Sequence, residues 1–79
     1  MFGLFDFLNV HIEVKIVTEI VKAQQISASF AAVMRMFADM VNEFAKAGTP
    51  GKITVTNLAD NSCLTFATEA YLRNFDIEE

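Results

Sequence analysis

The sequence predicts a small α+β domain in which one long amphipathic helix packs with a small antiparallel sheet. Two observations carry this prediction. Apolar residues recur at every third or fourth position over residues 16–44, which is the period of an amphipathic helix. β-Branched residues alternate with polar ones at 10–17 and flank a turn sequence within 52–68, which is typical of strands. We therefore expect an N-terminal strand, the helix, a C-terminal β-hairpin and a short C-terminal helix.

Composition limits how a chain of this size can be stabilised. Its 79 residues are enough for a single domain, 1–79, and 53% of them are hydrophobic, which is too many for a disordered chain. The one cysteine and one histidine cannot form a disulfide or supply the four ligands of a structural zinc ion. A core of this size contributes only ~3–5 kcal/mol unaided. Oligomerisation is the support that the sequence permits.

The first nine residues, MFGLFDFLN, form an apolar segment with Asp6 as its one charge. The segment lacks the basic residues and cleavage site of a signal peptide and is too short to span a membrane. We expect 1–9 to be an apolar arm or short helix that packs on its own domain or on a neighbouring subunit. The alternative is contact with a membrane surface through Phe2, Phe5 and Leu8, although such segments usually carry Lys or Arg.

The next run, VHIEVKIV at 10–17, alternates Ile12, Val14 and Ile16 with polar residues. This alternation predicts a half-buried strand. An N-terminal extension of the helix is the rival, because Ile16 also begins the helical repeat. The repeat fails one step earlier, at Glu13, which favours the strand.

The helix is expected over 18–47, with a length of ~45 Å. Its coiled-coil-like seam advances by alternating steps of four and three through Ile16, Ile20, Ala23, Ser27, Phe30, Met34, Phe37, Val41 and Phe44. Thr18 is a suitable N-cap. Ser27 or Ser29 could instead cap a shorter helix after a break at Gln24-Gln25. We favour the long helix because the seam runs unbroken through that dipeptide.

The helix is expected to end near Ala47, because Gly48 suits a left-handed cap and Pro50 cannot continue the helix. A six-residue strand spans only ~20 Å, so more than half of the apolar stripe would overhang the sheet. An equivalent helix of a second subunit would cover it. The predicted oligomer interface consists of the apolar seam and an alanine flank, namely Phe30, Ala31, Met34, Phe37, Ala38, Val41, Phe44 and Ala45.

The C-terminal third contains the clearest strand signals. Strand-forming residues at 53–56 and 63–66 flank the turn sequence Ala59-Asp60-Asn61-Ser62, so 52–68 is predicted to be a β-hairpin. Glu69 opens a segment, 69–75, in which Tyr71, Leu72 and Phe75 would share one face of a short helix. The acidic residues 76–79 are expected to be a solvated tail.

Charge and residue types argue against several functions. The net charge is −4 and the six Lys and Arg residues are scattered, which disfavours a nucleic-acid partner. His11 lies in a strand pattern, and no basic neighbour would lower the pKa of Cys63. We therefore predict no catalytic residue, no metal site and no cofactor. A single unpaired cysteine is typical of a reducing compartment, so we expect a cytoplasmic protein.

The leading hypothesis is a small acidic, non-enzymatic protein-protein interaction module of the adaptor or inhibitor type. It would act as a homo-oligomer, most simply a dimer, and bind a further protein. Three alternatives stand beside it. These are a structural subunit of a larger assembly, a peripheral membrane protein that uses the Phe-rich N-terminus, and a small-ligand binder with a pocket between subunits lined by Phe30, Met34 and Phe37.

Overall fold

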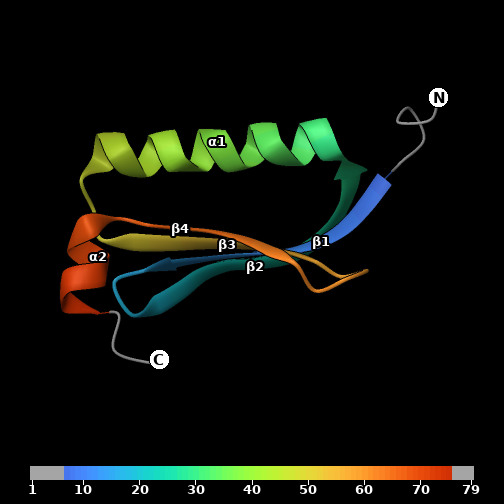
Figure 1. The fold of residues 1–79 in the computed structure, drawn as a ribbon. Helices are drawn as coiled ribbons and strands as arrows, with labels where there is room; N and C mark the ends of the chain where they lie inside the picture. Colours follow the sequence, from blue (N-terminus) through green and yellow to red (C-terminus); the bar gives the residue numbers. More distant parts are fainter. Residues whose placement is uncertain (1–6, 76–79) are drawn as a thin grey trace.

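The described residues form one antiparallel sheet with a long helix along one of its faces (Figure 1). The computed structural model describes residues 7–75. In chain order the elements are β1 (Phe7–Ile16), β2 (Glu19–Ser29), α1 (Phe30–Ala47), β3 (Gly51–Asn57), β4 (Cys63–Ala67) and α2 (Glu69–Asn74). The strand order is β2-β1-β3-β4, so β1 and β3 are central. The α+β class, the N-terminal strand, the C-terminal hairpin and the short terminal helix are confirmed.

The prediction of a helix over 18–47 is wrong in its first part. Residues 19–29 form β2, which pairs antiparallel with β1 from end to end. Helix α1 has 18 residues, and its N-cap is Ser29, whose hydroxyl accepts a hydrogen bond of 3.2 Å from the Ala32 N–H. The β-branched residues of β2 are poor helix formers, and a hairpin beside β1 closes only a short loop. Residues 19–29 therefore pair with β1 as a strand, although their apolar residues also fit the helical period.

The shorter helix removes one argument for association. An 18-residue helix is about 27 Å long, whereas the 10 residues of β1 span about 33 Å. The apolar stripe of α1 consequently does not overhang the sheet. Homo-oligomerisation stays a prediction, but the length mismatch that we expected from the sequence does not exist.

A two-residue turn, Val17-Thr18, joins β1 to β2. Val17 has a positive φ of 58°, and its N–H donates to the Pro50 carbonyl over 2.9 Å. A positive φ at the first loop residue only is the signature of a type II′ turn, where glycine is preferred. The register of β1 against β2 then shifts between Val14 and Lys15, so β2 contains a bulge shortly after this turn.

The core lies between α1 and the two central strands. Paired residues of β1 and β3 point to the same face, as Ile12 and Val55 do. The buried apolar residues are Val10, Ile12, Val14, Val33, Phe44, Ile53 and Val55. Gly51 belongs to the same layer, because a Cβ atom there would overlap the Phe44 ring. Most polar residues of the central strands lie on the opposite face of the sheet, whereas Asn57 at the end of β3 pairs with Val10 and lies on the core face.

Helix α2 closes the end of the sheet that holds the β1–β2 turn (Figure 1). Thr68 is its N-cap, and the Thr68 hydroxyl accepts hydrogen bonds of 3.1 Å from both the Tyr71 and the Gly51 N–H groups. The Thr68 N–H in turn donates to the Gly51 carbonyl over 2.9 Å. Tyr71 is buried as a result.

Candidate protein-interaction site

Strand β2 is an edge strand, and among the described residues no strand pairs with its outer side. It has 11 residues, and residues 19–25 are all exposed. Natural edge strands are usually short or are protected by charges, prolines or bulges. β2 carries such protection only near its start, where Glu19, Lys22 and the bulge lie. Residues 23–29, AQQISAS, contain no charge and no proline, and they form an open template for a further strand.

The register shows which backbone groups of β1 point toward β2. The Leu58 N–H donates to the Asn9 carbonyl over 2.9 Å, so Asn9 directs its backbone groups toward β3. Backbone directions alternate along a strand. Val10 and Ile12 therefore direct their N–H and C=O groups toward β2.

The same alternation identifies the free backbone groups of β2. Ile26 and Gln24 lie opposite Val10 and Ile12, so they complete the hydrogen bonds between the two strands. The residues between and beside them direct their N–H and C=O groups away from the sheet. These outward residues are Ala23, Gln25 and Ser27, and we refer to them as the β2 edge.

Helix α1 is hollowed at two places, of which one lies against β2. One, of about 200 Å³, lies between the helix and β2 and includes Gln24, Ile26, Met36 and Asp39 in its lining. The other, of about 360 Å³, is lined by helix residues alone, among them Arg35, Met36 and Asp39. Arg35 and Asp39 are four residues apart, but the one salt bridge within residues 7–75 joins Glu69 and Arg73 at 2.9 Å. Both charges are thus available at this side of the molecule.

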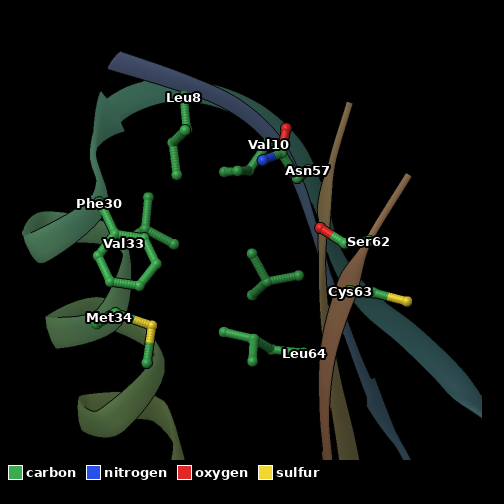
Figure 2. Close-up of a pocket in the computed structure, with 10 residues that line it drawn as sticks. Leu8, Val10, Phe30, Val33, Met34, Asn57, Ser62, Cys63 and Leu64 are labelled. Atoms are coloured by element: carbon green, nitrogen blue, oxygen red, sulfur yellow. The ribbon is translucent and has the colours of Figure 1, made fainter. Parts of the chain in front are cut away.

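A separate cavity of about 350 Å³ lies between the first turns of α1 and the β3–β4 end of the sheet. Figure 2 shows the side chains of Leu8, Phe30, Val33 and Leu64 around it, whereas the sulfur of Cys63 points away. The polar side chains of Asn57 and Ser62 in its lining already form hydrogen bonds within the β3–β4 turn. The surface left for an occupant is mainly apolar.

The β3–β4 turn at the rim of this cavity is held by its own side chains. The Asn57 amide oxygen accepts from the Ala59 N–H over 2.9 Å. The Asp60 carboxylate accepts from the Ser62 N–H over 3.0 Å and from the Ser62 hydroxyl over 2.7 Å. These two hydrogen bonds, the backbone one first, hold the pKa of Asp60 below its usual value. The turn chemistry predicted at residues 59–62 is confirmed.

His11 and Cys63 share the polar face of the sheet without meeting. His11 lies opposite Thr56, and Thr56 lies opposite Cys63. Two strand spacings, about 10 Å, therefore separate their backbones, which is beyond hydrogen-bond distance. The described part of the chain contains no group of three or more His, Cys, Asp or Glu residues placed to hold a metal ion.

The interface residues predicted from the sequence fall into three environments. Phe44 is buried in the core. Met34, Phe37 and Val41 are half-buried beside the sheet, while Phe30, Ala31, Ala38 and Ala45 are exposed. The structure places this set on the helix, and its role as an interface stays a prediction. The β2 edge was missed because its residues had been assigned to the helix.

The residues predicted to contact a membrane are only partly described. Leu8 lies in β1, is half-buried against the core and lines the apolar cavity. Phe2 and Phe5 lie outside the described residues, as does the acidic tail 76–79. Neither helix within residues 7–75 combines the length and apolar character needed to cross a membrane.

The charge of the described part differs from that of the whole chain. Residues 7–75 hold all six Lys and Arg residues and six acidic ones. The net charge of −4 therefore comes from Asp6, Asp76, Glu78 and Glu79. Electrostatic repulsion between the folded parts of two copies is correspondingly small.

Comparisons with protein-family models, curated proteins and solved structures each find no match to this chain. The fold and the site define the class as an α+β domain with an open sheet edge.

Proposed function

We propose that this chain is a small, non-enzymatic protein-protein interaction module of the adaptor or inhibitor type. It acts as a homo-oligomer and binds other strands by adding them to β2. The observation that carries this proposal is the β2 edge, where Ala23, Gln25 and Ser27 present outward backbone groups within an uncharged, proline-free segment. Strand addition draws its affinity from main-chain hydrogen bonds and its specificity from alternate side chains.

Two further features support the proposal. A domain of this size gains little stability from its own core, and a strand added to β2 would extend the sheet and satisfy its open backbone groups. The folded part also carries no excess charge to oppose association. A cytoplasmic location belongs to the same proposal, because the thiol of Cys63 is free and exposed, which suits a reducing compartment.

Self-association is expected to make stability depend on protein concentration, because assembly and folding are then linked. Light scattering should detect a species larger than the 8.8 kDa chain as concentration rises from low to high micromolar. The melting temperature should rise over the same range. A protein that stays monomeric at high micromolar concentration, with a melting temperature that dilution does not change, would contradict homo-oligomerisation.

A second function, binding of a small apolar ligand, is favoured by the cavity shown in Figure 2. Its volume of about 350 Å³ lies in the usual range of ligand pockets, roughly 300–1,000 Å³. Phe30 and Met34 line it, as the ligand hypothesis predicts, but Phe37 is not in its lining. The cavity lies within one chain, so ligand binding there does not require the pocket between subunits that we expected from the sequence.

This second function predicts that 1-anilinonaphthalene-8-sulfonate binds in the cavity and fluoresces. Leu64→Glu places a negative charge at the exposed rim of the cavity and should weaken binding by about tenfold or more, because the carboxylate repels the sulfonate of the dye. Leu72→Glu is the matched control, since Leu72 is an exposed leucine on α2. Equal fluorescence titrations for the two variants would show that the dye does not report on the cavity.

A further inference from the structure

We propose that two copies of this chain pair through β2 about a twofold axis at Gln25. Each β2 lies antiparallel to the β2 of the second copy, and the two sheets become one continuous sheet. The inference rests on the proposed self-association and specifies its geometry and its residues. It follows from the backbone register, the side chains of β2 and the adjacent flank of α1.

The backbone register selects Gln25 as the position of the axis. Hydrogen-bonded pairs across a new seam require residues whose backbone groups point outward, and in β2 these are Ala23, Gln25 and Ser27. Twofold symmetry requires that if one residue faces a second, the second faces the first in the other copy. Gln25 opposite Gln25 and Ala23 opposite Ser27 satisfy both conditions. This is the register in which every member of the β2 edge faces another member.

The two neighbouring registers, with the axis at Gln24 or at Ile26, pair fewer residues of the β2 edge with one another. An axis at Gln24 would place Ser27 opposite Val21, next to the bulge. An axis at Ile26 would place Ala23 opposite Ser29, whose side chain caps α1. Either shift leaves part of the β2 edge without a regular partner, so the symmetric arrangement at Gln25 has the most regular hydrogen bonds.

The side chains of β2 are compatible with the same register. Glu19 lies beyond the overlapping segment, and Lys22 lies opposite Ala28 of the second copy, so no like charges face each other. Ala23 and Ser27 are small, and the two Gln25 amides meet at the axis, where each can donate and accept. Charge at the seam therefore does not oppose pairing.

Helix α1 contributes a second contact at the axis. Gln24 and Ile26 share one hollow with Met36 and Asp39, so this part of the helix stands beside Gln25. The twofold axis keeps both helices on the same face of the sheet and orients them antiparallel. Arg35 and Asp39 of the two copies then follow one another in opposite order along the seam, and neither charge has an ion-pair partner within residues 7–75. The two flanks are thus complementary in charge.

Two double variants test the register directly. Ala23→Lys/Ser27→Lys places like charges opposite each other at both symmetry-related positions, whereas Ala23→Lys/Ser27→Glu places opposite charges there. Both positions lie on the polar face of an edge strand, so the fold of one chain should tolerate either pair. We expect the first variant to weaken dimerisation by about tenfold or more and the second to recover it. Light scattering at several salt concentrations measures both, and the recovered dimer should weaken as salt rises.

Gln25→Pro removes the outward N–H at the axis and should give a folded monomer, because an edge strand tolerates proline where the N–H faces outward. Ala45→Glu is the control. Ala45 is exposed, lies nine residues from Met36 and thus on the opposite side of the helix, and is more than one turn from Asp39, so the dimer should persist. A dimer that is lost in Ala45→Glu but retained in Gln25→Pro would overturn the β2 pairing and place the interface on the helix.

The outcomes separate this inference from the function on which it rests. A parent protein that is monomeric at high micromolar concentration would overturn the proposed homo-oligomer itself. If the parent protein is dimeric and the dimer persists unchanged in Gln25→Pro and in both double variants, the twofold pairing at Gln25 is overturned but the homo-oligomer is not. Recovery of the dimer by Ala23→Lys/Ser27→Glu, after its loss in Ala23→Lys/Ser27→Lys, is the result that supports it.

Discussion

Replacing Phe44 with alanine is expected to lower the free energy of unfolding by about 3–5 kcal/mol. Phe44 is 8% exposed and belongs to the core between α1 and the sheet. Its removal loses the burial of an aromatic ring and leaves a cavity that the surrounding strands fill only in part. Because the stability of a small domain is of the same order, a large fraction of the variant should be unfolded at room temperature. Urea unfolding followed by circular dichroism measures the change.

Phe30→Ala is the matched control, because Phe30 begins the same helix but is 64% exposed. Its replacement should change stability by less than about 1 kcal/mol, since surface positions contribute little. Similar losses in Phe30→Ala and Phe44→Ala would contradict the packing of α1 on the sheet.

The contact of Phe44 with Gly51 can be isolated by a double-mutant cycle. Gly51→Ala alone introduces a methyl group that overlaps the Phe44 ring, so it should destabilise the protein by about 1–3 kcal/mol. In the Phe44→Ala background the same methyl group enters the vacated space, and the loss should disappear. An equal effect of Gly51→Ala in both backgrounds would show that the two residues do not touch.

The features of the fold that were predicted correctly are each identified by residues that lie within the feature itself. Gly48 ends α1 with a φ of 70°, and its N–H donates to the Phe44 carbonyl over 3.0 Å. Asp60 and Ser62 close the β3–β4 turn through their own hydrogen bonds. In each case the residue that identifies the feature also forms the interaction that stabilises it, so sequence and structure agree.

Strand β2 could not be identified in this way, because its sequence does not alternate between apolar and polar residues. The side chains that it directs toward the α1 side are Lys22, Gln24, Ile26 and Ala28, and only the last two are apolar. An edge strand extends past the core, so its inward face need not be apolar. Ile20, Ala23 and Ser27 then continued the helical period by coincidence, and the prediction followed that period.

The open edge of β2 could not be predicted from the sequence either. Whether a strand has an open edge depends on the order of strands in the sheet, and here β1 lies between β2 and β3. The sequence of β2 contains no residue that indicates this strand order. The apolar cavity, in contrast, includes Phe30 and Met34, which the helical seam had already identified as apolar positions.

The hairpin of β1 and β2 was not predicted, because its turn lacks the residues that usually identify one. A two-residue hairpin turn is usually recognised by glycine or asparagine, but here the turn is Val17-Thr18, with Val17 at a φ of 58°. A left-handed conformation costs a non-glycine residue roughly 1–2 kcal/mol, and a β-branched side chain is among the least suited to it. The hairpin therefore forms in spite of its turn, through the pairing of β2 with β1.

Val17→Gly is accordingly expected to raise the free energy of unfolding by about 1 kcal/mol, because relief of the strained conformation exceeds the entropy that glycine adds to the unfolded chain. Val17 is 39% exposed, so little buried surface is lost, and its N–H can still donate to the Pro50 carbonyl. Thr18→Gly is the control. Thr18 does not have a positive φ, so glycine there should only add unfolded-state entropy and lower stability by roughly 0.5–1 kcal/mol. Urea midpoints of the two variants should therefore move in opposite directions, and a shift of both to lower urea would contradict the left-handed conformation of Val17.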